Sequence, residues 1–86
     1  MATTLEQTKR QAERVTGISN IAYDLMVVLT NKLQGVAAIE GYKQDANVAS
    51  DQQAADFLMR IEERELQEIG ELRELVMQRL QLAHQA

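Results

Sequence analysis

The chain has 86 residues, 45% of them hydrophobic, and its 9 Lys and Arg residues against 13 Asp and Glu residues give a net charge of −4 at pH 7. That length allows one small domain. With no Cys and a single His, His84, the chain cannot form disulfides, thiolate sites or a site built from two of its own imidazoles. The negative charge disfavours nucleic acid as a partner.

No apolar run approaches the roughly 20 residues that a membrane span needs, and no apolar signal segment follows Met1. We therefore expect a cytoplasmic protein that does not bind a membrane. The composition favours helix throughout, because Ala, Leu, Gln and Glu lose little rotamer freedom in a helix, and no strand pattern competes.

Residues 1–17 predict an N-terminal arm or short helix, poor in apolar residues, that ends at Gly17. Residues 18–86 predict a long antiparallel helical hairpin. Its first helix covers about 19–46, and Ser19 or Asn20 is the candidate cap.

The second helix of the hairpin is expected over about 51–82. Ser50 supplies a candidate N-cap hydroxyl, and Gln53 stands three residues later, as in a capping box. Residues 47–49 then form the tight connection between the two helices.

The two predicted helices carry apolar residues in steps of three and four, which is the spacing of a coiled-coil-like seam. Residues equally far from the connection of an antiparallel hairpin lie at the same level. One register then gives five apolar pairs: Ile21 with Val76, Leu25 with Leu72, Val28 with Ile69, Val36 with Ile61, and Ile39 with Leu58.

The apolar surface of both helices is wider than one partner helix can cover. The additional positions are Ala22, Met26, Leu29, Leu33, Val36 and Ala37 in the first helix, and Leu66, Met77, Leu80, Phe57, Leu75 and Leu82 in the second. We therefore predict an all-α chain whose hairpins form a homodimer, a four-helix bundle. The alternative is a three-helix monomer that uses the N-terminal arm.

A charged layer interrupts the apolar seam. The register places Lys32 opposite Glu65, with Glu62 one turn away and facing Gly35, whose missing side chain would admit a close approach. Glu40 continues a neighbouring face. Burying such ions unpaired costs several kcal/mol for each ion, so we expect them to be paired, hydrated or bound to a ligand.

At these residues the segment from Val28 to Leu72 resembles one hairpin of the ferritin-like superfamily, especially the rubrerythrin-type and bacterioferritin-type bundles. Each hairpin of that superfamily supplies one Glu from its first helix and a Glu-x-x-His motif from its second, and two hairpins enclose a di-iron site. The resemblance puts Glu65 at the Glu of this motif, Glu68 at its His, and Lys32 at the Glu of the first helix. It thus implies a metal site converted into a salt bridge.

The chain also resembles a group of short cyanobacterial proteins with no assigned function. Three segments carry this likeness: Leu33-Gln34-Gly35, Glu40-Gly41-Tyr42 and Glu62-Glu63-Arg64-Glu65. This second resemblance implies no activity.

These observations predict a metal-free structural or protein-interaction module without a cofactor, in which the Lys32 layer fixes the register of the helices. The alternative is a ferritin-like metal protein that binds iron, or manganese or calcium, through four carboxylates: Glu40, Glu62, Glu65 and Glu68. Catalysis by paired carboxylates needs a cleft and two acids in unlike environments. We do not expect an enzyme, since a narrow bundle supplies neither.

Overall fold

The computed structural model describes residues 4–85, with side chains as far as residue 81, and this part of the chain contains only helices. The all-α prediction is confirmed. The helices are α1 (Thr4–Thr16), α2 (Asn20–Val48) and α3 (Gln52–Gln85). The ends of the predicted ranges, residues 1–3 and 86, and the side chains of Leu82 and His84 lie outside the described residues.

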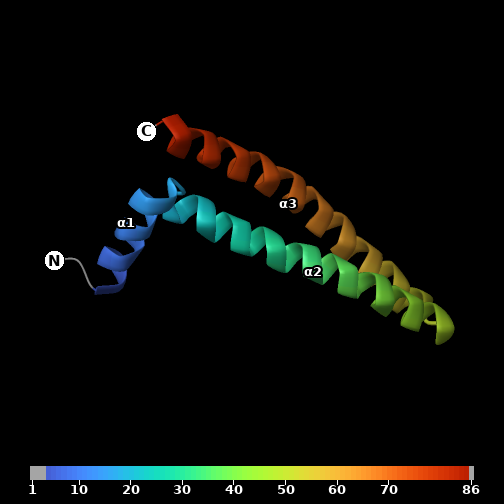
Figure 1. Cartoon of the computed structure of the whole chain (residues 1–86). Helices are drawn as coiled ribbons and strands as arrows, with labels where there is room; N and C mark the ends of the chain where they lie inside the picture. The colour runs from blue at the N-terminus through green and yellow to red at the C-terminus, as the bar shows by residue number, and fades with distance from the viewer. Residues whose placement is uncertain (1–3, 86) are drawn as a thin grey trace.

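The chain reverses after α2, and α3 runs back alongside it, while α1 projects from the opposite end of α2 (Figure 1). None of the helices between residues 4 and 85 combines the length and the apolar character that crossing a membrane requires.

The junction of α1 and α2 forms around Gly17, as the sequence predicts. Gly17 has a φ of 73°, in the left-handed region that glycine enters at no steric cost, and its N–H donates to the Glu13 carbonyl at 2.8 Å. Ser19 caps α2, because its Oγ accepts a hydrogen bond of 3.0 Å from the Ala22 N–H. The Asn20 N–H donates to the Glu13 carboxylate, which ties α1 to the first turn of α2.

The turn between α2 and α3 differs from the prediction that Ser50 caps α3. Ser50 has a φ of 56°, and it ends α2 in a Schellman motif: its N–H donates to the Asn47 carbonyl at 3.1 Å, and the Asp51 N–H donates to the Ala46 carbonyl at 2.9 Å. Asp51 is the N-cap instead, since its Oδ1 accepts from the Ala54 N–H at 3.0 Å.

Both long helices extend beyond their predicted ends. The Schellman motif continues α2 to Val48 rather than to about residue 46, and α3 reaches Gln85 rather than about residue 82. The displaced cap moves the start of α3 to Gln52.

The hydrophobic core is thin. Six apolar residues of the described part are buried, and three of them are alanines: Ala22, Ile39, Ala46, Ala55, Leu72 and Val76. No large side chain among the described residues is fully buried. Since α1 contributes no buried residue, it does not act as the third helix of a closed core.

The molecule is elongated, with extents of 55 × 26 × 19 Å. Its radius of gyration is 18.2 Å, whereas a compact chain of this length has about 12 Å. Its accessible surface is 6756 Å², whereas a folded monomer of this mass exposes about 5,100 Å². One layer of helices therefore leaves much of its surface in water.

Candidate functional site

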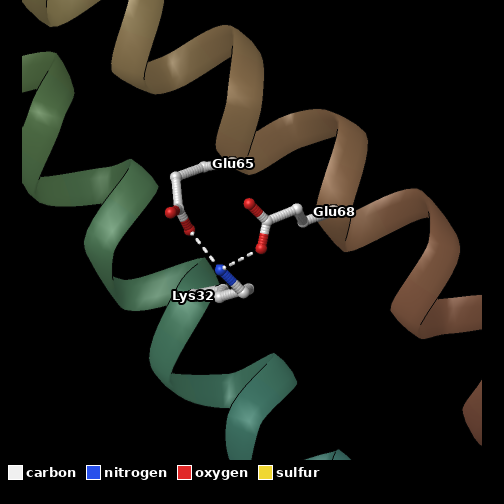
Figure 2. Close-up of polar contacts among 3 residues, drawn as sticks. All are labelled: Lys32, Glu65 and Glu68. Carbon is white, nitrogen blue, oxygen red and sulfur yellow. Dashed lines mark hydrogen bonds and ion pairs between the residues drawn. The ribbon is translucent and has the colours of Figure 1, made fainter.

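The first ion-pair cluster lies where the sequence places a charged layer. Lys32 Nζ on α2 donates to Glu65 Oε2 at 3.0 Å and lies 3.0 Å from Glu68 Oε2, both on α3 (Figure 2). Lys32 and Glu65 are half-buried, and Glu68 is more exposed. The two carboxylates approach one ammonium group from successive turns of α3, so this cluster joins the two long helices at a single level.

A second cluster lies nearer the turn and centres on Lys43, which the sequence reasoning missed. Lys43 Nζ donates to Glu62 Oε1 at 2.9 Å across the helix pair, and it lies 3.1 Å from Glu40 Oε1 one turn back on α2. The prediction grouped Glu62 with Lys32. In the structure Glu62 forms its ion pair with Lys43, and Glu68 forms one with Lys32.

Side-chain direction accounts for this exchange. Helical side chains point toward the N-terminus of their own helix. On α2 that direction leads away from the turn, and on α3 it leads toward the turn. Each lysine therefore contacts a glutamate whose backbone lies farther from the turn than that of the lysine. This favours Glu68 as the partner of Lys32 and Glu62 as the partner of Lys43. This rule could have found the second cluster from sequence.

The electrostatics of both clusters stabilise the ionised forms. Hydrogen bonds to Glu68 and then Glu65 raise the pKa of Lys32 above its ordinary value of 10.5. Glu62 and then Glu40 raise the pKa of Lys43 in the same way.

The pKa of Glu62 is lowered from its ordinary value of 4.5, first by the neighbouring Glu40 and then by Lys43. These shifts move the pKa values of Lys32, Lys43 and Glu62 farther from neutral pH. They suit permanent ion pairs rather than a proton donor or acceptor that operates near pH 7.

The four acids of the metal alternative are divided between the two lysines. Glu65 and Glu68 contact Lys32, while Glu40 and Glu62 contact Lys43. Residues 4–81, whose side chains the structure describes, hold no group of three or more His, Cys, Asp or Glu residues arranged for a metal ion. An ammonium group also occupies the space between each pair of acids, and this donor set does not fit a di-iron site.

The hairpin presents one apolar face on each side of its seam. By helical spacing, the Leu33/Leu66 face, beside the Lys43 cluster, comprises six exposed residues: Leu33, Ala37, Met59, Leu66, Gly70 and Met77. The Val28/Leu75 face, on the opposite side, comprises Ile21, Val28, Gly35, Tyr42, Phe57 and Leu75. A hollow of about 520 Å³ lies on the second face, between Gly35, Tyr42 and Ile61.

Glycine does not bring the helices of this chain together. A Cβ atom built on Gly35 would meet no atom within 4 Å, and the same holds for Gly41 and Gly70. The expected close approach at Gly35 is therefore wrong within one hairpin. Gly35 and Gly70 instead lie on the two exposed apolar faces.

No family model, curated protein or solved structure matches this chain.

Proposed function

We propose that this chain is a non-catalytic, metal-free structural module that works by self-association, two hairpins pairing into a homodimeric four-helix bundle. The observation that carries the proposal is the imbalance between six buried apolar residues and fifteen exposed large hydrophobic ones among the described residues. A monomer rarely leaves so much apolar surface in water. Pairing of two copies removes part of it from solvent.

The surface area agrees with a dimer of this size. The accessible surface exceeds that of an average monomer of the same mass by about 1,600 Å². The excess accessible surface of two chains together is about 3,200 Å². If pairing buries this excess, the interface falls in the range of about 2,000–5,000 Å² that is typical of obligate homodimers.

The Lys32 cluster serves, in this proposal, as a register device. Displacing α3 along α2 by one turn would take Lys32 out of contact with either Glu65 or Glu68 and would also move Glu62 relative to Lys43. A single polar layer sets register in other helical assemblies at some cost in stability. The resemblance to ferritin-like hairpins then concerns architecture, with an ion pair in place of the metal ligands.

The mass in solution and the metal content of the same purified sample test this proposal. We expect twice the chain mass of 9.7 kDa by light scattering and no stoichiometric iron, manganese or calcium by elemental analysis. A monomer at all concentrations contradicts the proposal. A bound metal, with a higher unfolding temperature when that metal is added, would favour the ferritin-like alternative instead.

The double variant Lys32→Met with Glu65→Leu tests the register role. It replaces a half-buried pair by apolar side chains of similar size, and we expect a dimer whose unfolding temperature equals or exceeds that of the wild type. Lys32→Met alone is the matched control, because it leaves Glu65 and Glu68 side by side without their cation, and it should unfold at a lower temperature. A large loss of stability in the double variant would contradict the role.

A further inference from the structure

We propose that the second copy packs on the Leu33/Leu66 face, with the two turns at opposite ends of the bundle and α3 against α3. This inference rests on the homodimer proposed above and adds its face and its orientation. Leu33 and Leu66 lie at the same level, 17 residues before and 16 residues after Ser50. They are 52% and 51% exposed, so each presents half of its surface to a partner.

The face of α3 is complementary to itself when two copies run in opposite directions. Residues on either side of position 68 then oppose one another across the two-fold axis, which pairs Met59 with Met77 and Leu66 with Gly70. Nothing lies within 4 Å of a Cβ built on Gly70. A leucine of the second copy can therefore occupy the space that Gly70 leaves, as a large residue packs against a small one in interlocked helices.

Charge favours the same arrangement. Arg73 is exposed and makes no ion pair within the described residues, while Glu40, Glu62 and Lys43 form a cluster with a net charge of −1. The antiparallel pairing places Arg73 of each copy opposite Glu63 of the other and beside Glu62. Two complementary contacts then form at once, one at each end of the interface.

The alternative orientation, with both turns at one end, is less favourable. It brings the two Lys43 clusters to the same level, so that four carboxylates share two lysines, and it leaves Arg73 far from both clusters. Arg73 lies 11 residues beyond Glu62 on α3, about 16 Å along the helix. Repulsion between like charges therefore selects against this orientation.

The Val28/Leu75 face is the less favourable surface for the same kind of pairing. Glu68 lies on the line of α3 that joins Ile61 to Leu75, seven residues from each. Two antiparallel copies centred there would bring Glu68 against its own counterpart. The second acid would add a negative charge where Lys32 already has two carboxylates.

Two leucine substitutions distinguish the faces. Leu66→Glu places a charge at the centre of the proposed interface, and we expect it to weaken dimerisation by about 30-fold or more in sedimentation equilibrium. Leu75→Glu is the matched control on the other face, where Leu75 is 38% exposed, and it should change the dissociation constant by less than about threefold. Circular dichroism establishes that both variants remain helical.

Disulfide cross-linking tests the orientation in a chain that has no cysteine of its own. Met59 and Met77 are 18 residues apart, about 27 Å along α3, and a disulfide needs Cα atoms within about 7 Å. An oxidised mixture of Met59→Cys and Met77→Cys should give the mixed cross-linked dimer. Oxidised Met59→Cys alone should not cross-link.

The outcomes separate the two proposals. A wild-type monomer overturns the dimer and this inference together. A wild-type dimer that Leu75→Glu dissociates and Leu66→Glu leaves intact overturns the face and keeps the dimer. Cross-linking of Met59→Cys with itself, without the mixed product, overturns the orientation alone.

Discussion

α1 and α3 both connect to α2, but different interactions hold them. α3 lies along the length of α2, buries Leu72 and Val76, and shares two ion-pair clusters with it. α1 buries no residue, and the Gly17 turn and the hydrogen bond from the Asn20 N–H to Glu13 connect it to α2. The turn and the cap thus connect α1 to α2. Burial and ion pairing between α2 and α3, in contrast, contribute to the stability of the hairpin.

The largest expected effect compares a buried leucine with an exposed valine. Leu72 is 8% exposed and Val15 is 80% exposed. Leu72→Ala removes buried methyl groups from the seam of α2 and α3 and should lower the free energy of unfolding by about 2–4 kcal/mol. Val15→Ala should change it by less than about 0.5 kcal/mol. Urea unfolding at one fixed protein concentration measures both.

Equal losses in the free energy of unfolding of the two variants would mean that α1 belongs to the same cooperative unit as the hairpin. A loss confined to Leu72→Ala supports an α1 that opens separately. The helical signal of Val15→Ala before the main transition provides the control for local fraying of α1.

Sequence reasoning succeeded where local chemistry alone decides the structure. Glycine is almost the only residue type that adopts the left-handed region at a helix end without strain, so Gly17 marks the end of α1. The hydroxyl of Ser19 is suited to an N-cap. The register of the two helices also predicts that Lys32 and Glu65 lie at one level, and the two side chains form an ion pair there.

It failed where two local signals competed or where side-chain direction mattered. Ser50 and Asp51 are both good caps, and the geometry of the Schellman motif gives the cap to the second of them. Lys43 lies off the expected layer, yet its long stem reaches Glu62 on the other helix. Neither result follows from hydrophobic periodicity.

The second prediction compares Ser50 and Gly17, the two residues of the described part of the chain that have a positive φ. Ser50→Gly removes the Cβ that disfavours this conformation, so it should raise the free energy of unfolding by about 0.5–1 kcal/mol. Ser50→Ala keeps the Cβ and should bring no gain. Gly17→Ala introduces the same strain at the α1 junction, and it should reduce helicity without a comparable shift of the main unfolding transition. A large shift would show that α1 stabilises the hairpin.

The third prediction concerns pH and has the smallest expected effect, because the groups are partly exposed and water screens them. The lowered pKa of Glu62 means that its contribution is present above its ordinary value of 4.5 and is lost as the pH falls through the lowered pKa. The raised pKa values of Lys32 and Lys43 mean that their contribution is present below 10.5 and is lost as the pH rises through the raised values.

Stability should therefore form a plateau between these limits, with a modest decline on each side. Urea midpoints measured across this range test the expectation, and Lys32→Met with Lys43→Met should flatten the alkaline decline. An alkaline decline that persists without both lysines would have to come from another group. Since Lys32, Lys43 and Glu62 lie on α2 and α3, an effect that follows these substitutions assigns the pH response to the hairpin and not to α1.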